Sequence, residues 1–482
     1  MNAYLTIDPS WMFKPIINTK VLEMKATAII AIAVVVVVVG AGVGAAIYMN
    51  NNNKDSTDYS NVNSKLMVRG NANGDFTVDG DDLSIVDKVI AGDLKKEDYP
   101  LADANNDGDV NDADKEQIQN MIDHKEGMTI YVISLNSAGN ETTISVKYPL
   151  RNVVVYATNM EMPCVYCNGG KYIAGYFTKS YATAEKSFNA EAVDLEGQQR
   201  TISDAAWTNF TNLDASLVAK GTPIGALLVD YSGIAQITES RMSDLNDSGI
   251  PLISYTSADA TDELTTVLTL GYLFGGDCEK MGLDYAKIGW DVKDKIKEKT
   301  DALEKKKSYI CGTMFIYICG KTSSFNTSAT TAGGVAYATL NAGFDSKYTK
   351  NSTKMASTEA LSNYTDADVF INNRSMDWGL DADAKKDLII DTWDHSNSGT
   401  SSRVYFSGWE DKLFYVNNLL PGGAKLAYMA HAMYGDLFDR EWADGILKQY
   451  IDLGTLPLEG QTLDSILAFI KFSDYKAAAG IA

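Results

Sequence analysis

The sequence predicts a protein of the α/β class, with two α/β lobes joined by one long helix. A transmembrane helix and a small all-α segment with two calcium-type loops precede the lobes. Three observations lead to this prediction: an uncharged run near the N-terminus, two copies of an oxygen-rich 12-residue pattern behind it, and strand-like runs alternating with helical patterns over the rest of the chain. Alternation of that kind is typical of largely parallel sheets.

The composition limits the classes of function. At 482 residues the chain is too long for one ordinary domain. Its formal net charge of −21 disfavours nucleic acid as a partner, because phosphate binding needs clustered Lys and Arg. The excess is uneven: residues 70–127 hold 16 acidic and 5 basic side chains, a net −11, about half of the total. Such a concentration favours a cation site over a general solubility coat.

The run Ala26–Met49 holds no charge over 24 residues. As a helix rising about 1.5 Å per residue it would span roughly 36 Å, enough to cross a bilayer. Lysines precede it and polar, acidic residues follow, so the positive-inside rule predicts a single-pass protein of the cell membrane, with residues 1–25 cytoplasmic and the remainder extracellular. A cleaved signal peptide is the alternative, although such peptides have apolar cores of about 7–15 residues. Residues 50–69 are expected to form a flexible stalk.

Two stretches, "NANGDFTVDGDD" and "DANNDGDVNDAD", place oxygen-bearing side chains at nearly every second position. Calcium takes about six to eight oxygens, and a 12-residue loop supplies them from positions 1, 3, 5, 7, 9 and 12. In the first loop these are Asn71, Asn73, Asp75, Thr77 (through its carbonyl), Asp79 and Asp82. In the second loop they are Asp103, Asn105, Asp107, Asp109 (through its carbonyl), Asn111 and Asp114.

Two calcium sites are therefore predicted, and the second is expected to be the stronger. Position 1 of the first loop is neutral, and Phe76 replaces the turn glycine that Gly108 supplies in the second loop. Fewer charges and a strained turn should both weaken binding.

A helical pattern follows each loop, in "DLSIVDKVIAG" and in "KEQIQNMI". Loop plus helix, twice and closed by Asp, resembles the dockerin module over residues 70–127. The resemblance implies calcium-dependent binding to a cohesin module on a surface protein, through the helices and loop positions 10 and 11. Here those positions hold Gly80 and Asp81, then Asp112 and Ala113, rather than the Ser-Thr pair common in cellulose-degrading assemblies.

Residues 128–482 carry the strand and helix patterns of the lobes. "MTIYVISL" and "ETTISV" predict a hairpin, and "RNVVVYA" predicts a buried strand. Further strands are expected in "IGALLVDY", "IPLISY", "SYICGTMFIYIC", "DVFINN" and "RVYFSG". The stretch from Gly276 to Lys307 lacks proline and keeps its apolar residues near helical spacing, which predicts one helix close to 30 residues long. The expected lobes are residues 128–259 and 308–482, with a connecting helical segment at 260–307.

This order of lobe, long helix and lobe resembles the substrate-binding proteins of ABC importers for iron-siderophore, haem and cobalamin. The resemblance is carried by "ISVKYPLRNVVVYATN", "NLDASLVAKGTPIGALLVDYSG", "STEALSNYTDADVFINN" and "KLAYMAHAMYGDLFDREWADGILKQYID", and it covers Met128–Ala482. It implies capture of an iron or corrinoid-type chelate and docking to an ABC permease. It also implies that one carboxylate on each lobe pairs with permease arginines, here Asp214 and Glu359. The alternative for both is a solvated acid at a helix start, favoured there by the helix dipole.

The stretch "NMEMPCVYCNGG" follows the first strand of the first lobe, where the resemblance places a cleft loop. The candidate ligand contacts are Asn159, Met160, Met162, Cys164 and Cys167. Thioether and thiolate sulfur favour copper(I), zinc or haem iron over calcium. The Cys pair is also consistent with a disulfide, with a low-pKa thiol near a helix N-terminus, or with neither.

Other cleft candidates follow from sheet geometry, because open α/β sheets bind ligands beyond the carboxyl ends of their strands. Tyr231 and Ser232 end one predicted strand, and Asn373 and Arg374 end another. The planar fork of Arg374 can hold a carboxylate or catecholate oxygen. Trp409 is a further candidate, with a core position as its alternative.

Catalysis finds little support in the sequence. Its three histidines are scattered, and it contains no GxSxG, HExxH or Walker pattern, so a non-enzymatic protein is predicted. One alternative is a surface assembly or adhesion protein recruited through dockerin–cohesin pairing. A dockerin-borne polysaccharide hydrolase ranks third.

Overall fold

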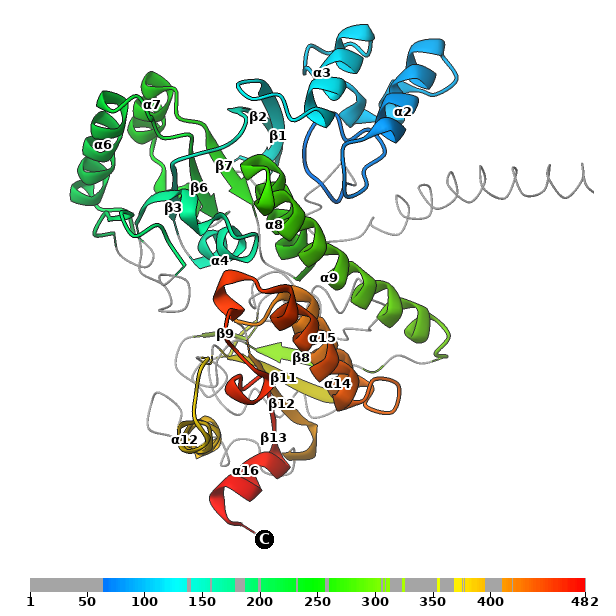
Figure 1. Ribbon diagram of the computed structural model, residues 1–482. Helices are drawn as coiled ribbons and strands as arrows, with labels where there is room; N and C mark the ends of the chain where they lie inside the picture. Colours follow the sequence, from blue (N-terminus) through cyan, green and yellow to red (C-terminus); the bar gives the residue numbers. More distant parts are fainter. Residues whose placement is uncertain are drawn as a thin grey trace, which may run out of the picture. The chain divides into compact units, whose positions relative to one another are not determined.

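The computed structural model describes residues 64–136, 140–156, 158–177, 187–197, 201–230, 233–255, 260–304, 307, 309–312, 323–325, 353–355, 368–374, 376, 378–394, 410–417 and 419–481 (Figure 1). The chain divides into two compact units, Met1–Asp58 and Tyr59–Ala482, and the described residues all belong to the second. The predicted cytoplasmic tail, the run Ala26–Met49 and most of the predicted stalk lie outside them. Among the described helices, none is long and apolar enough to span a bilayer.

The loop module, residues 70–127, contains the helices α2 (Gly80–Ala91) and α3 (Asp112–Ile122). Two 3-10 turns, η2 (Lys96–Asp98) and η3 (Pro100–Ala102), lie between them. Each α-helix starts with a capping box, in which position 9 and position 12 of the preceding loop accept each other's backbone N–H. The acid that closes each loop therefore also fixes the start of the helix that follows.

The segment ahead of the first loop belongs to the fold. Leu66 and Val68 are fully buried, and Val68 pairs with Val132 in an isolated antiparallel bridge. The predicted stalk extended to residue 69, so its last residues were wrongly assigned. Leu66, Met67 and Val68 form a short apolar run between Lys65 and Arg69, and the stalk prediction passed over it.

The predicted hairpin is present as β1 (Thr129–Leu135) and β2 (Glu141–Lys147), which pair antiparallel. The first sheet follows, with five strands in the order β5-β4-β3-β6-β7, and its pairs are all parallel. Its strands are β3 (Val153–Tyr156), β4 (Ile173–Tyr176), β5 (Val193–Asp194), β6 (Ala226–Asp230) and β7 (Leu252–Tyr255). The order reverses between β3 and β6, as in doubly wound sheets.

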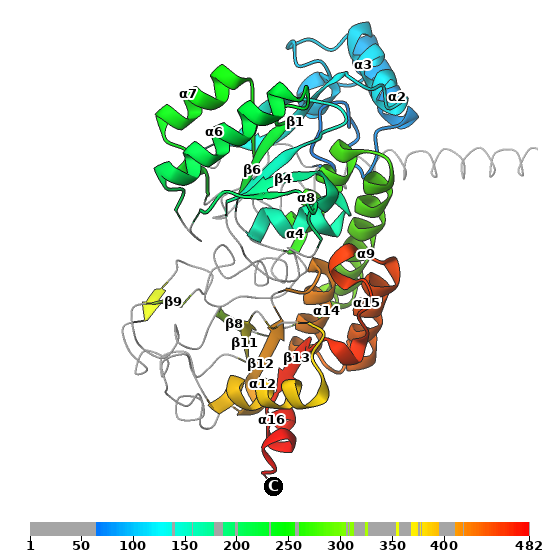
Figure 2. The same ribbon diagram turned by 60° about the vertical axis from the view of Figure 1, so that its left-hand side comes forward.

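Helices cover both faces of the first sheet (Figure 2). They are α4 (Thr158–Tyr166), α6 (Asp204–Ala219), α7 (Glu239–Ser248) and α8 (Ala260–Phe274), with 3-10 turns η4 (Gly169–Tyr172) and η5 (Gly233–Gln236). Val154 shares a core cluster with side chains of α6 and α7, whereas its neighbours Val153 and Val155 share one with α4 and α8. A run of β-branched residues without polar alternation is what a strand buried on both faces requires.

The long helix α9 runs from Asp277 to Asp301, 25 residues, in place of the predicted 30. It is separated from α8 by Gly275 and Gly276, both with positive φ (69° and 58°), a conformation that favours glycine and ends α8. Its C-terminus falls before the lysine run that the sequence pattern had included.

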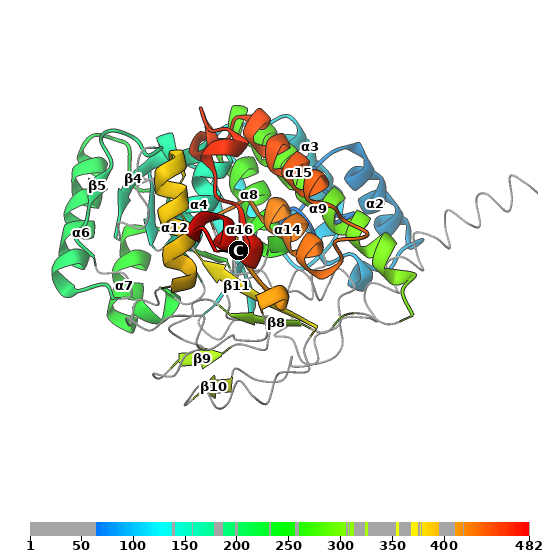
Figure 3. The same cartoon turned by 90° about the horizontal axis from the view of Figure 1, so that it is seen from below.

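The second sheet has the order β13-β12-β11-β8, with β13 antiparallel and the other pairs parallel. Its strands are β8 (Tyr309–Gly312), β11 (Val369–Arg374), β12 (Leu413–Asn417) and β13 (Phe469–Lys471); β9 (Ser323–Phe325) and β10 (Thr353–Met355) pair separately. Its helices are α12 (Ala382–Asp394), α14 (Gly422–Met433), α15 (Arg440–Leu453) and α16 (Phe472–Ala479), with turns η7 (Glu410–Lys412), η8 (Leu456–Leu458) and η9 (Leu463–Ser465). Helices α14 and α15 pack side by side (Figure 3).

The prediction of a mixed α/β fold with largely parallel sheets is confirmed. The predicted strands at residues 153–156, 226–230, 252–255 and 369–374 are present, whereas "RVYFSG" lies outside the described residues. Strand β8 lies within the predicted "SYICGTMFIYIC". Strands β4, β5, β9, β10, β12 and β13 were not predicted.

Candidate functional site

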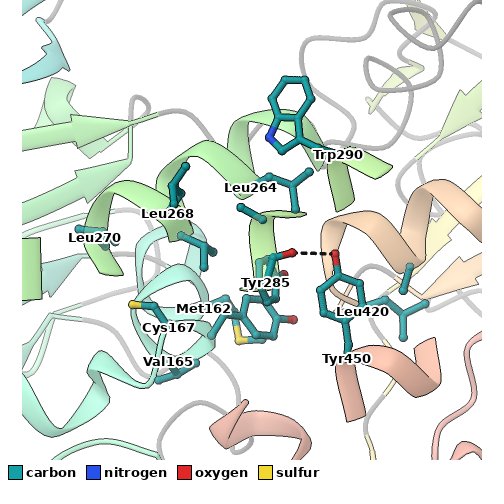
Figure 4. Packing of buried hydrophobic residues seen from close by; sticks show 14 of the residues in the cluster. Met162, Val165, Cys167, Leu264, Leu268, Leu270, Tyr285, Trp290, Leu420 and Tyr450 are labelled. Carbon is teal, nitrogen blue, oxygen red and sulfur yellow. Dashed lines mark hydrogen bonds between the residues drawn. The ribbon is translucent and has the colours of Figure 1, made fainter. Parts of the chain in front are cut away.

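The predicted cleft loop forms most of helix α4 and the turns that follow it, and its sulfur side chains are buried. Met160, Cys164 and Cys167 have 0% of their surface exposed and Met162 has 7%. Met162 and Cys167 pack beside Leu268 of α8 in the core cluster (Figure 4). The structure therefore places these residues in the core, and a ligand contact through them stays a prediction.

Both thiols of the Cys pair are free, so the disulfide alternative is wrong. The Cys167 Sγ–H donates to the Cys164 carbonyl oxygen over 3.2 Å. Burial raises the pKa of both thiols, that of Cys167 strongly, and the nearby Glu161 raises the pKa of Cys164 further. A low-pKa reactive thiol is therefore also ruled out, because reactivity needs the thiolate.

The strand-end candidates are only partly described. Asn373 and Arg374 do end strand β11, as predicted, but their side chains lie outside the description. Tyr231, Ser232, Trp409 and the side chain of Asn159 also lie outside it, as does Glu359. Their roles stay predictions.

The edge of the first sheet where the strand order reverses carries a buried acid that the sequence analysis missed. Asp230 is the last residue of β6, is 5% exposed, and its Oδ1 accepts a hydrogen bond from the Gly233 backbone N–H at 2.6 Å. A side chain at Gly233 would meet the Tyr156 ring at 2.5 Å, so the turn after β6 requires glycine. Ligands of doubly wound sheets bind beyond this reversal point.

A second buried polar group joins helices that lie far apart in the sequence. Glu263 of α8 accepts hydrogen bonds from the Tyr285 hydroxyl of α9 (2.5 Å), the Gly422 N–H (2.8 Å) and the Lys425 ammonium (2.7 Å). The side chains of Glu263 and Lys425 are only 8% and 6% exposed. The carboxylate also lies at the N-terminus of α14, where the helix dipole stabilises negative charge. This network fixes α14 to both α8 and α9.

Asp214 lies in the second half of α6, which begins at Asp204 behind its cap Ser203. It is therefore not a helix-start acid, and that alternative is wrong for this residue. Its side chain is half-buried, and its Oδ1 accepts no hydrogen bond from any described residue. Asp214 lies beyond the first turn of α6, where the helix dipole no longer favours a carboxylate, so the helix itself does not explain it.

The first calcium-type loop is closed around Asn71, which is fully buried. Its Nδ2 donates to Ser64 Oγ, to the Leu66 carbonyl and to the Asp75 carbonyl, each over 2.9 Å. Its Oδ1 is buried and receives no hydrogen bond from the described residues. An amide oxygen of this kind is a ligand that calcium accepts.

The carboxylates of the first loop crowd one another. Asp82 is fully buried and accepts hydrogen bonds from the Asn73 N–H (3.0 Å) and the Asp79 N–H (2.8 Å). Burial raises the pKa of Asp82 to about 7, with Asp75 and Asp79 adding to the rise and the two hydrogen bonds opposing it. A neighbouring cation would relieve this cost of ionisation.

The predicted strain at Phe76 is absent. Phe76 is not among the positive-φ residues of the described chain; Gly74 has φ of 71° instead. The first loop is therefore not weakened by a strained turn at Phe76, and that prediction is wrong.

The second loop has the same hydrogen-bond pattern but is more open. Asp114 accepts from the Ala104 N–H (2.7 Å) and the Asn111 N–H (2.8 Å), and burial raises its pKa. Asp107 and Asp109 are exposed. In both loops the carboxylates at positions 5 and 12 accept hydrogen bonds from loop N–H groups. In the described part of the chain, no group of three or more His, Cys, Asp and Glu is arranged to hold a metal ion.

No family model matches the chain, and no curated protein does. Several solved structures are similar. The TroA-like periplasmic binding protein FepB from Veillonella parvula is 14% identical with a TM-score of 0.44, over 70% of this chain and 99% of that one. The molybdate periplasmic binding protein MolA from Haemophilus influenzae is 12% identical with a TM-score of 0.43, over 67% and 97%. A periplasmic haem-binding protein from Pseudomonas aeruginosa is 18% identical with a TM-score of 0.37, over 59% and 93%. These values are too low to indicate a shared ligand.

Proposed function

We propose that residues 128–482 form the solute-binding protein of an ABC importer and capture an iron-siderophore, haem or corrinoid-type chelate. The observation that carries this proposal is the pair of largely parallel sheets separated in sequence by one continuous 25-residue helix, α9. Each sheet brings the carboxyl ends of its parallel strands to one edge, which is where open α/β sheets bind ligands. Asp230 and Arg374 end strands at those edges. In this proposal the protein binds and delivers its solute and is not an enzyme.

The direct test is ligand binding by the purified full chain in detergent. Haem, a ferric catecholate siderophore and cobalamin are titrated separately while absorbance and tryptophan emission are followed. Binding of one of them with a Kd of about 1 μM or lower supports the proposal. Arg374→Ala should weaken binding of an anionic ligand by about tenfold or more, because charge-assisted hydrogen bonds are the strong ones. Arg440→Ala, a partly exposed arginine of α15, is the matched control. No binding to any of the three would count against the proposal.

Permease docking through Asp214 is part of the same proposal. Its support is the position of Asp214 well inside α6, where the start of the helix does not account for the acid. Truncating one partner of an interfacial charge pair commonly costs a few kcal/mol. Asp214→Lys with Glu359→Lys should therefore abolish uptake and leave solute affinity unchanged, whereas Asp247→Lys, an exposed acid of α7, should leave both unchanged. Normal uptake by the double variant at normal surface levels would refute the importer assignment.

A second proposal concerns residues 70–127, which we propose bind two calcium ions and, like a dockerin, recruit a cohesin-bearing surface protein. It is supported by the free Oδ1 of buried Asn71 and by the crowded acids around Asp82 and Asp114. Positions 10 and 11 of both loops are exposed, as contact with a partner requires. The test is calorimetric titration with calcium chloride, followed by binding of a purified cohesin in calcium and in EDTA. Equal cohesin binding in both, or none in either, would contradict it.

The membrane anchor at Ala26–Met49 completes the proposed arrangement, with the binding lobes held outside the cell beside the permease. Its support is the length of the uncharged run. Alkaline extraction of membranes followed by protease treatment of intact cells tests it, since an anchored external protein stays in the membrane and is cleaved.

A further inference from the structure

The first loop lies against the long helix α9. The ring of Phe76 meets the indole of Trp290 edge-on, with centroids 6.5 Å apart and planes at 78°. Trp290 is 8% exposed, and Phe76 is half-buried and packs on the large core cluster. Phe76 occupies the loop position where calcium loops usually carry glycine. In this chain the residue at that position packs on Trp290, and the left-handed turn is made at Gly74.

The ammonium group of Lys65 lies close to both rings. Its Nζ lies 4.2 Å from the centroid of the Phe76 ring and 5.3 Å from that of Trp290. Both distances are within the range of cation–π attraction. The backbone of Lys65 is in turn held by the loop, because its N–H donates to the Gly74 carbonyl over 3.1 Å.

The segment that carries Lys65 is fixed on both sides. The Leu66 N–H donates to the Asp75 carbonyl (3.2 Å), and the Leu66 carbonyl accepts from Asn71 Nδ2. On the other side, the Met67 N–H donates to Thr269 Oγ1 of α8 (3.1 Å). The candidate ligands Asn71 and Asp75 therefore hold the same short segment that packs on α8 and α9.

Helix α9 is held from a second direction by the Glu263 network. Tyr285, which donates to Glu263, and Trp290 both belong to α9, and Trp290 points away from Tyr285 (Figure 4). One side of the helix is thus fixed by a buried charge network and the other by the first loop. A change in the loop backbone at Phe76 would shift the Phe76 ring against the Trp290 indole, because the two rings are in contact.

We propose that the first loop is a calcium site coupled to α9, so that cation binding by Asn71 and Asp75 fixes Phe76 against Trp290 and stiffens the helix between the two sheets. The inference rests on the proposed calcium binding of the loop module and adds its regulatory consequence. Thr77 and Asp75, the candidate ligands at positions 7 and 5, flank Phe76 in the chain, so binding at both fixes the backbone between them. Within the described part of the chain, the rings and cations around Trp290 are Phe76, Lys65 and Lys293, and none belongs to the second loop, so that loop should not be coupled.

The experiment titrates the full chain in detergent with calcium chloride, and with magnesium chloride as the control cation. Calorimetry counts the sites, and tryptophan emission of the wild-type chain minus that of Trp290→Phe isolates the signal of Trp290. Calcium should shift this difference spectrum. Phe76→Ala should lower the calcium affinity of one site by about tenfold and leave the other unchanged, because coupling between two sites is reciprocal. Ile90→Ala, an exposed residue of α2 (44%), is the matched control and should change neither site.

The outcomes separate the two proposals. Two calcium sites with no change in the Trp290 signal, and with equal affinities in Phe76→Ala and wild type, would refute the coupling and leave calcium binding intact. No calcium binding at all would refute the calcium proposal and the coupling with it. If Trp290→Phe does not fold, Lys65→Gln replaces it, since it removes the cation over both rings without touching the core; it should weaken the same single site as Phe76→Ala does.

Discussion

Lys425→Met should destabilise the folded chain by about 3–5 kcal/mol, because it leaves the Glu263 carboxylate buried without its cation. The Glu263 side chain is 8% exposed, so water cannot replace the lost ammonium. Methionine keeps most of the side-chain volume, which limits any cavity contribution. Glu263→Gln should cost a similar amount, because it leaves the Lys425 ammonium buried beside a neutral amide.

The double variant Glu263→Gln with Lys425→Met is the sharper test. No charge remains, and the Gln Oε1 can still accept from the Tyr285 hydroxyl and the Gly422 N–H, which now hydrogen-bond to Glu263. The double variant should therefore lose only about 1–2 kcal/mol, less than either single variant. Urea unfolding of the four proteins in EDTA measures the cycle. Additive losses in the double variant, or a loss below about 1 kcal/mol for Lys425→Met, would refute a charge-coupled network.

Two further predictions concern the loop module and its contact with α9. Asn71→Ala should lower the unfolding temperature even in EDTA, because it removes three hydrogen bonds, whereas Asp107→Ala, at an exposed position, should lower it only in calcium. This reverses the order expected from ligand charge alone, and scanning fluorimetry in both buffers checks it. Burial raises the pKa of Glu279 above its ordinary 4.5, while His124, 2.7 Å away, lowers it. The folded chain then holds the Glu279 proton more tightly than the unfolded chain does, so this stability is present below pH 4.5 and is lost as the pH rises through the folded pKa. Glu279→Gln should flatten the unfolding temperature over that window in EDTA, and an unchanged profile would contradict it.

The central strands of the first sheet could be predicted because their sequence signal is local. "VVVY" and "ALLVD" are apolar on consecutive positions, as strands covered on both faces require. The helices of the loop module were predictable for the same reason, because local capping residues and apolar spacing indicate each of them. Strand β13 has three residues and pairs antiparallel with β12 across about 50 positions of chain, so no local pattern marks it.

The candidate site was less predictable, because its chemistry depends on distant contacts. Glu263 looks like an ordinary acid in the first turn of a helix, yet its partner Lys425 comes from another helix, 162 positions later. Cys164 and Cys167 have the spacing of a ligand or disulfide pair, but Cys164 lies on α4, which packs on α8, Cys167 directly follows that helix, and both are buried. Spacing alone does not tell which face of a helix meets the core.

Phe76 illustrates how an apparent local defect can follow from tertiary structure. Against the pattern of a calcium loop it is a misfit, which suggests a weak site. In the fold its ring is packed on Trp290, and the loop makes its left-handed turn at Gly74 instead.

The packing of the loop module on the lobes limits where a partner of the module can bind. Met121 of α3 and the segment around Val68 are buried in the core shared with the lobes, so that side of the module is not available. A partner must approach from the loop ends at positions 10 and 11, which are exposed. Asp112→Asn with Asp81→Asn removes both charges there while keeping the side-chain volume, and should weaken cohesin binding with little change in the unfolding temperature. Unimpaired binding by this variant would place the contact elsewhere.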